Sequence, residues 1–209
     1  MRFGPTIIRK CSECSRLIKD FTVASANTVG AIRWTDGKCY MPMLPDELWF
    51  VKCPHCHTLL WIDEQEEAGE IDSFNDSSGH YKDAEQYGVP ELQDYYVELK
   101  KDNLGKIKEQ YLRLRAWWIG NDSRRDSSTK QALSEKEIEN LQALDKLLDP
   151  SDDEDRLMKA EIKRELGRFE EAEAMLKEPF PSDFAEDVSF LRELIQRREP
   201  FVEEMRFED

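Results

Sequence analysis

Two Cys-x-x-Cys motifs constrain the fold of this chain more than any other feature of its sequence. They are Cys11-Ser-Glu-Cys14 and Cys53-Pro-His-Cys56. Each motif places two thiols in one short loop, and four thiolates are a common ligand set for a tetrahedral Zn²⁺ ion. Because four sulfurs leave the ion no open coordination position, we expect a structural zinc site with Cys11, Cys14, Cys53 and Cys56 as its ligands.

Three other side chains are alternative candidates for chemistry. His55 and His57 are zinc ligands by type, although four cysteines already complete a tetrahedral site. Cys39 has no neighbouring base in the sequence, so we expect a packed cysteine. A thiol-based enzyme using Cys39 is the alternative to a non-enzymatic protein. Zinc knuckles often have glycine after the second cysteine, where φ is positive, but Ser15 and His57 stand there in this chain.

Short β-strand patterns flank both motifs. They cover residues 6–9, 17–21, 48–51 and 59–62. Between the motifs, Asp36-Gly37 separates the strand-like segments 31–34 and 38–41, which predicts a hairpin with a tight type I′ turn. Short strands around two cysteine loops are typical of a zinc ribbon. We therefore predict a small β zinc-ribbon domain over residues 1–62.

Residues 63–88 differ in composition from the segments on either side. They are acidic and rich in turn-forming residues, as in Asp63-Glu-Gln-Glu-Glu and Ser73-Phe-Asn-Asp-Ser-Ser-Gly-His80. Few apolar residues are available to anchor this segment to a core, so we predict a linker.

From residue 89 onward the apolar residues recur with a helical period. Pro90 suits a first helical turn, and Ser134 with Glu137 forms a capping-box sequence. The apolar stripes are Leu92/Tyr95/Tyr96/Leu99, Ile107/Tyr111/Leu114/Trp118, Ile138/Leu141/Leu144/Leu148 and Phe184/Val188/Leu191/Ile195. We predict an all-α domain over residues 89–209, and hence an α+β fold class for the chain.

One segment of the helical region resembles a tetratricopeptide repeat. Residues 157–176 predict a helix, a turn at Gly167, and a second helix in which Phe169 and Ala172 allow close packing. Lys159 and Lys163 depart from the pattern, because the first helix of a repeat usually has large apolar residues there. With one good copy of the repeat, we predict a helical bundle or a short tetratricopeptide-like solenoid.

Charge is distributed unevenly along a chain whose formal net charge is −15. Residues 1–61 contain eight Lys/Arg and five Asp/Glu, whereas residues 62–209 contain 22 and 40. Such an acidic body repels a phosphate backbone, which disfavours nucleic-acid binding by the whole protein. The basic excess of the ribbon, with Trp34 and Tyr40 as a stacking surface, leaves a nucleic-acid accessory factor as the alternative function.

Four arginines and two tryptophans form the basic and aromatic cluster of the helical region. They are Arg113, Arg115, Trp117, Trp118, Arg124 and Arg125. Tryptophans at helical spacing usually pack in a core, and the arginines would then pair with acidic groups. The alternative is that the four arginines contact an anion or an acidic peptide.

The cysteine pattern and hydropathy also indicate a compartment. No apolar run reaches the ~18 residues of a membrane span, and no charged-then-apolar signal segment opens the sequence. Two close CxxC pairs favour a reducing compartment over disulfide formation, so we expect a cytoplasmic protein without a membrane partner.

Several of these segments together resemble a group of uncharacterised bacterial proteins that join a zinc ribbon to a tetratricopeptide-like helical region. The segments are residues 27–37, Pro42-Met-Leu-Pro45, Cys53-Pro-His-Cys56 and residues 160–176. The resemblance implies a four-cysteine zinc module and a helical interaction domain in the cytoplasm, and it brings no activity with it. We therefore expect a zinc-binding, non-enzymatic interaction or scaffold protein whose protein partner and oligomeric state the sequence does not identify.

Overall fold

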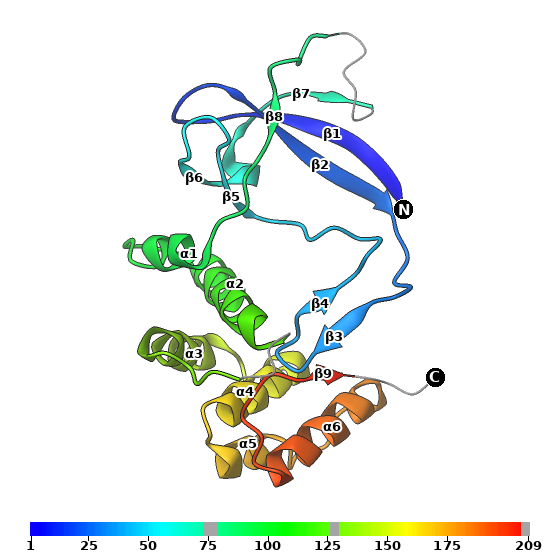
Figure 1. Cartoon of the computed structure of the whole chain (residues 1–209), viewed down its shortest axis with the longest axis vertical. Coiled ribbons are helices and arrows are strands. Elements are labelled where there is room, and N and C mark those ends of the chain that lie inside the picture. The colour runs from blue at the N-terminus through cyan, green and yellow to red at the C-terminus, as the bar shows by residue number, and fades with distance from the viewer. Residues whose placement is uncertain (73–78, 126–129, 206–209) are drawn as a thin grey trace. The chain divides into compact units, whose positions relative to one another are not determined.

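A computed structural model describes residues 1–72, 79–125 and 130–205 of the chain (Figure 1). The chain forms two compact units and has mixed α and β content. Unit 1 comprises Met1–Ala31 and Tyr40–Asp94, and unit 2 comprises Ile32–Cys39 and Tyr95–Asp209. The predicted boundaries placed the hairpin segment in the N-terminal domain, whereas the structure groups residues 32–39 with the helices.

Unit 1 is built on a four-stranded sheet and a separate hairpin. The sheet has the order β7-β1-β2-β8, in which β1 pairs antiparallel with β2 and β7, and β8 pairs parallel with β2. Its strands are β1 (Arg2–Lys10), β2 (Leu17–Ser25), β7 (Glu66–Ile71) and β8 (Glu85–Gln86). The hairpin consists of β5 (Phe50–Lys52) and β6 (Leu59–Trp61), followed by the 3₁₀ turn η1 (Ile62–Glu64).

The segment predicted to be a linker supplies two strands to this sheet. Its anchors are few but well placed, because Ile71 and Ala84 are buried against Ile8 of β1. The other side chains of β7 are mostly exposed, including three glutamates. Charged side chains are frequent on edge strands, where they discourage pairing with other chains. The edge strand β7 therefore has the acidic composition that also characterises linkers.

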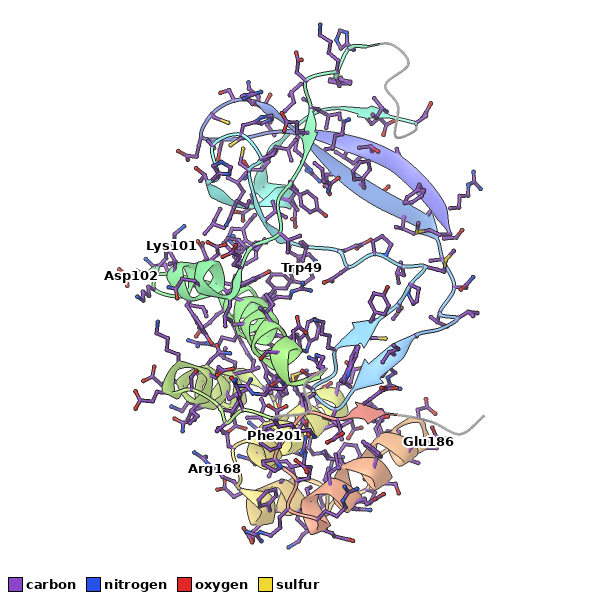
Figure 2. All side chains as sticks on the ribbon, in the orientation of Figure 1. Trp49, Lys101, Asp102, Arg168, Glu186 and Phe201 are labelled. Carbon is purple, nitrogen blue, oxygen red and sulfur yellow. The ribbon has the colours of Figure 1, made fainter. Side chains whose placement is uncertain are left out.

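Unit 2 contains six α-helices within the described residues. They are α1 (Leu92–Glu98, which begins at the end of unit 1), α2 (Lys106–Arg125), α3 (Glu135–Leu147), α4 (Asp153–Glu165), α5 (Phe169–Met175) and α6 (Ala185–Gln196, preceded by the 3₁₀ turn η2, Ser182–Phe184). Side chains of neighbouring helices project into the space between them (Figure 2). None of the helices in the described part of the chain is both long enough and apolar enough to span a membrane.

The helix signals in the sequence differ in how well they locate the buried face. The capping box of α3 is confirmed, since Ser134 and Glu137 each bond the other's backbone N–H. Leu141 and Leu144 of the predicted stripe are buried. In α2, by contrast, Ile107 is 72% exposed, and the buried positions are Leu112, Arg115, Ala116, Trp117, Asn121 and Arg124. That face carries polar side chains, which an apolar periodicity does not detect.

Helices α4 and α5 form the pair predicted from the repeat-like segment. Gly167 follows the C-terminal end of helix α4 and has φ of +73°, and the N–H of Arg168 bonds the carbonyl of Lys163 at 2.8 Å. This is a Schellman ending, which reverses the chain. Ala160 and Ala172 are fully buried between the helices. The structure shows this pair but not a solenoid of repeats.

The two lysines that depart from the repeat pattern bind a carboxylate on a neighbouring helix. The ammonium groups of Lys159 and Lys163 lie 3.2 and 3.3 Å from the carboxylate of Asp145 in α3. Both side chains are nearly buried. Ion pairs therefore occupy positions where a repeat usually has apolar packing.

The predicted hairpin is confirmed, but its turn differs from the prediction. Strands β3 (Ile32–Trp34) and β4 (Cys39–Tyr40) join the C-terminal strand β9 (Glu204–Met205) in the order β4-β3-β9. Gly37 has φ of +79°, whereas Asp36 is not among the residues with positive φ. A type I′ turn needs positive φ at both central residues, so this is instead a type I turn closed by a left-handed glycine. The carboxylate of Asp36 accepts the N–H of Lys38 at 3.1 Å, which favours that turn.

Candidate metal centre

The four predicted cysteine ligands come together in unit 1. The sulfurs of Cys11, Cys14, Cys53 and Cys56 all lie within 4.8 Å of one another. Two of the inter-sulfur distances, Cys11 to Cys56 and Cys14 to Cys53, are 3.8 Å. Four sulfurs arranged tetrahedrally at about 2.3 Å from one ion lie about 3.8 Å apart. The cysteines are free thiols rather than disulfides, so the group can hold a metal ion of this coordination.

Each cysteine pair lies in a loop with the same backbone hydrogen bonds. In the β1–β2 loop the N–H of Ser15 bonds the carbonyl of Cys11 at 2.9 Å. In the β5–β6 loop the N–H of His57 bonds the carbonyl of Cys53 at 3.0 Å. The N–H of the first cysteine in each loop in turn bonds the carbonyl five residues later, at 2.9 and 2.8 Å. Two unrelated tetrapeptides therefore adopt one knuckle geometry.

The residues after the second cysteines have the backbone conformation that glycine usually supplies. Ser15 has φ of +59° and His57 has φ of +61°. A residue with a β-carbon is strained in this left-handed region by roughly 1–2 kcal/mol. In this conformation the N–H of each residue bonds the carbonyl of the first cysteine of its knuckle.

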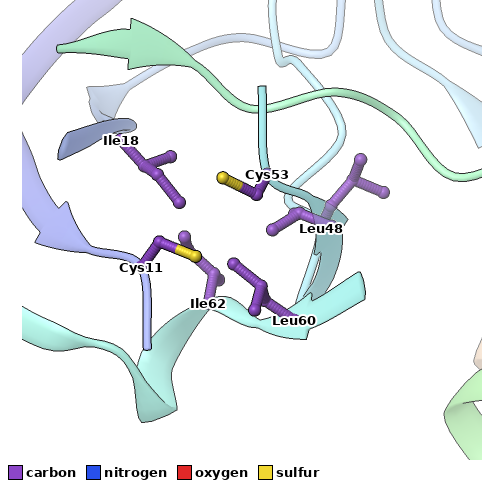
Figure 3. Close-up of a cluster of buried hydrophobic side chains, with 7 residues drawn as sticks. Cys11, Ile18, Leu48, Cys53, Leu60 and Ile62 are labelled. Carbon is purple, nitrogen blue, oxygen red and sulfur yellow. The ribbon is translucent and has the colours of Figure 1, made fainter. Parts of the chain in front are cut away.

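The environment of the sulfurs is asymmetric. Cys11 and Cys53 are buried in a cluster with Ile18, Leu60 and Ile62, and their side chains point toward one another (Figure 3). Burial raises the pKa of the Cys11 thiol, and it raises that of Cys53 to about 12. A bound cation would offset the cost of ionising these buried thiols, because metal ligation requires thiolates and lowers the pKa of the thiols.

The exposed member of the set is Cys56. Hydrogen bonding with the side chain and backbone of Thr58 lowers the pKa of the Cys56 thiol to about 6. Thr58 Oγ1 lies 3.4 Å from the Cys56 sulfur. The site thus combines two desolvated thiols with one that is already favoured as thiolate.

The two histidines of the second motif are not part of the sulfur cluster. Nε2 of His55 lies 2.9 Å from the carbonyl oxygen of Leu17, and Nδ1 lies 3.4 Å from the carboxylate of Glu85. Both ring nitrogens of His55 therefore contact β2 and β8, and they connect the second knuckle to the sheet. His57 is exposed.

One supporting residue of the first knuckle was not identified from the sequence. Gln65 is buried, and its Oε1 accepts the N–H of Ser12 at 3.0 Å while its Nε2 donates to the carbonyl of Trp61 at 3.0 Å. It thereby joins the first cysteine loop to the segment that follows the second. It lies in the acidic segment predicted to be a linker, and nothing in its local sequence distinguishes it.

The arginines considered as anion contacts lie on α2 in unit 2, and carboxylates lie close to three of them. The ion pairs are Arg113–Glu109 at 2.8 Å, Arg124–Glu137 at 2.7 Å and Arg125–Asp36. The fourth, Arg115, is buried and has its guanidinium 5.4 Å from the ring centre of Trp118. The indole N–H groups of Trp117 and Trp118 donate to Glu165 and to the carbonyl of Asp36.

The remaining candidates from the sequence are Cys39, Trp34 and Tyr40, none of which is a member of the sulfur cluster. Burial raises the pKa of the Cys39 thiol, which is the opposite direction from that of an activated nucleophile. The guanidinium of Arg125 lies 4.8 Å from the ring centre of Trp34, and Tyr40 is exposed.

Comparison of the chain with protein-family models, with curated proteins and with solved structures found no match.

Proposed function

We propose that the protein binds one structural Zn²⁺ ion through Cys11, Cys14, Cys53 and Cys56, and that it acts as a non-enzymatic interaction protein. The observation that carries the zinc assignment is the 3.8 Å spacing of two sulfur pairs within one four-thiolate cluster. Four thiolates select soft or borderline cations, and among these zinc is the usual occupant of a closed tetrahedral site. With no vacancy for water or substrate, the ion has a structural role.

The proposed zinc stabilises a unit whose own apolar core is small. The buried cluster around the sulfurs contains five aliphatic or aromatic side chains besides the cysteines Cys11 and Cys53, namely Ile18, Leu48, Val51, Leu60 and Ile62. Small cores of this kind frequently require a metal, and the free energy of binding then contributes directly to folding. The ion would hold the β1–β2 loop and the β5–β6 loop together.

The partner is proposed to be a protein rather than a nucleic acid. The α4–α5 pair has the close alanine packing and glycine turn of a tetratricopeptide-like hairpin, a unit used in protein-binding surfaces. Unit 1 as a whole contains seven Lys/Arg and 15 Asp/Glu, because the sheet includes acidic segments absent from the predicted ribbon. The basic excess that favoured nucleic-acid binding is therefore reversed within the unit itself.

The metal assignment is tested with full-length protein by elemental analysis. We expect one zinc per chain. A strong chelator should remove this zinc and at the same time make the four cysteine thiols reactive. Cys53→Ser should lose the metal and destabilise the protein. Cys39→Ser is the matched control and should retain one zinc, because Cys39 lies outside the cluster. Retention of zinc by Cys53→Ser, or another metal in stoichiometric amount, would contradict the assignment.

The interaction role is tested with the zinc-loaded full chain as bait. A specific protein partner should be captured in amounts that survive nuclease treatment and 0.15 M salt. The nucleic-acid alternative is tested by titrating the protein into fluorescently labelled single-stranded DNA and RNA at low salt. Tight, steeply salt-dependent binding of either would instead favour the nucleic-acid alternative.

A further inference from the structure

Unit 2 contains a cavity of about 330 Å³ that the metal centre does not involve. It lies among the C-terminal half of α2, the start of α3, the α4–α5 turn and the segment before β9. Its apolar walls are Ala132, Leu133, Ile138, Leu166, Pro200, Phe201 and Val202. Five polar or charged side chains also line it, namely Asn121, Arg124, Gln142, Glu165 and Arg168, which is the N-cap residue of α5. Phe201 and Arg168 are labelled in Figure 2.

The carboxyl group of Glu165 is the buried polar group of this cavity. Glu165 is 6% exposed, and it accepts hydrogen bonds from Trp117 Nε1 at 3.0 Å and from Asn121 Nδ2 at 3.0 and 3.3 Å. Two of these three contacts go to Oε2, so Oε1 has a single donor among the described residues. A carboxylate oxygen has room for two donors. Oε1 can therefore accept a hydrogen bond from a molecule in the cavity.

The charges around Glu165 favour a positively charged partner. Burial raises its pKa well above the usual range, and the negative charges of Glu161 and Asp36 raise it further. Arg164 opposes this effect but is itself bonded to both oxygens of Glu161, at 2.7 and 2.6 Å. A cation at Oε1 would offset the cost of keeping this buried carboxylate ionised, a cost that otherwise favours its protonated form.

The buried guanidinium that lines the cavity, that of Arg124, is not available to bind an anion. Arg124 has five N–H donors, and all five are used. They bind both carboxylate oxygens of Glu137 and the backbone carbonyls of Gly120, Gln131 and Ala132. Arg168 is partly exposed, so water screens its charge. The polar groups therefore favour a hydrogen-bond donor over a carboxylate or phosphate.

We infer that this cavity binds a small organic amine, with an apolar body of about two fused rings and an ammonium group directed at Glu165 Oε1. The size follows from comparison, since an apolar cavity of about 150 Å³ accommodates benzene. A mostly apolar pocket of a few hundred cubic ångströms with convergent polar groups is the usual form of a small-molecule site. All lining residues belong to unit 2, so failure of this inference leaves the proposed zinc site unaffected.

Three probes of one shape test the inference on the full-length, zinc-loaded protein. They are 2-naphthylmethylamine, the neutral 2-naphthalenemethanol and the anionic 2-naphthoate. Binding is measured by isothermal titration calorimetry and saturation-transfer NMR at 0.15 and 0.5 M salt, because a chain of net charge −15 attracts any cation weakly at low salt. We expect saturable binding of the amine that persists at high salt and is at least tenfold tighter than that of the alcohol or the naphthoate.

Two variants and one control connect the binding to the cavity. Glu165→Gln keeps the shape of the side chain. It should weaken the binding of the amine at least tenfold without affecting the binding of the alcohol. Ile138→Phe should narrow the cavity and weaken the binding of every probe. Ile107→Phe makes the same exchange at a site 72% exposed and should change nothing. Circular dichroism and thermal unfolding identify variants that fail to fold, and binding is compared only among folded ones.

Three results would overturn the inference. The first is naphthoate binding more tightly than the amine, which would assign the polar end to Arg168. The second is amine binding that both Glu165→Gln and Ile138→Phe leave unchanged, which would mean surface association. The third is the absence of saturable binding of any probe by the folded protein.

Discussion

At the scale of single residues, the candidate metal centre depends on two positions with positive φ. Ser15 and His57 close the knuckles in a conformation that costs a residue with a β-carbon roughly 1–2 kcal/mol. The chain tolerates this cost at both knuckles, since each N–H is needed to bond the carbonyl of the first cysteine. The strain is a local feature that substitution with glycine can remove.

We predict that Ser15→Gly stabilises the metal-loaded protein by about 0.5–1 kcal/mol. Glycine adopts positive φ without steric strain, although it loses more backbone entropy on folding, so the gain is smaller than the strain. Denaturant unfolding of the zinc-loaded protein measures the change. Ser12→Gly is the control in the same loop. Ser12 is not among the positive-φ residues, so this substitution should destabilise the protein. Equal effects of the two substitutions would contradict the role assigned to φ.

At the scale of secondary-structure elements, the β3–β4 hairpin is held in unit 2 by its turn. Asp36 is 1% exposed, and its carboxylate accepts hydrogen bonds from the side-chain amide of Asn121 and the guanidinium of Arg125. Its backbone carbonyl receives the indole N–H of Trp118 at 2.9 Å. One acidic residue at a turn thus satisfies donors from three positions of α2, and strand β9 completes the attachment by pairing with β3.

We predict that Asp36→Asn destabilises unit 2 by about 3 kcal/mol. The substitution keeps the shape of the side chain but leaves the guanidinium of Arg125 buried with its charge less compensated, and breaking one side of a buried ion pair typically costs this much. Asp122→Asn is the matched control, since Asp122 also binds Arg125 but is 45% exposed in its side chain and should cost less than about 1 kcal/mol. Denaturant unfolding followed by tryptophan fluorescence measures both. A similar, small effect of the two substitutions would show that the buried pair does not hold the hairpin.

The elements that could be predicted from the sequence are those specified by local chemistry. The capping box of α3, the turn after α4 and the four thiols each depend on a few residues close together in the chain. The partner of the hairpin could not be predicted, because Asp36 appears in the sequence only as a turn residue. Strand β7 was missed because its exposed glutamates conceal one buried Ile71. Long-range pairing of polar groups leaves no period in the sequence.

At the scale of the whole molecule, the chain is not divided into consecutive domains. It leaves unit 1 after Ala31, contributes eight residues to unit 2, and returns at Tyr40 before entering unit 2 again at Tyr95. Residues 32–39, which lie between the two cysteine motifs in the sequence, therefore belong to the unit that does not contain the candidate metal site. Folding of the metal centre requires residues on both sides of this excursion to meet, whereas the excursion itself depends on contacts with α2 and β9.

This organisation predicts an unusual pattern of amide hydrogen exchange when the metal is removed. Chelation should increase exchange in residues 1–31 and 40–72, because the two knuckles lose the ion that joins them. Residues 32–39 should keep the slow exchange of unit 2, since their stability comes from Asp36 and from pairing with β9. Mass spectrometry of peptides from zinc-loaded and chelated protein makes the comparison, with α3 as the internal reference. Asp36→Asn supplies the converse, since it should release residues 32–39 while the loaded knuckles remain protected. Loss of protection in residues 32–39 together with their sequence neighbours on chelation would mean that the hairpin follows the metal centre, and the two-unit description would have to be abandoned.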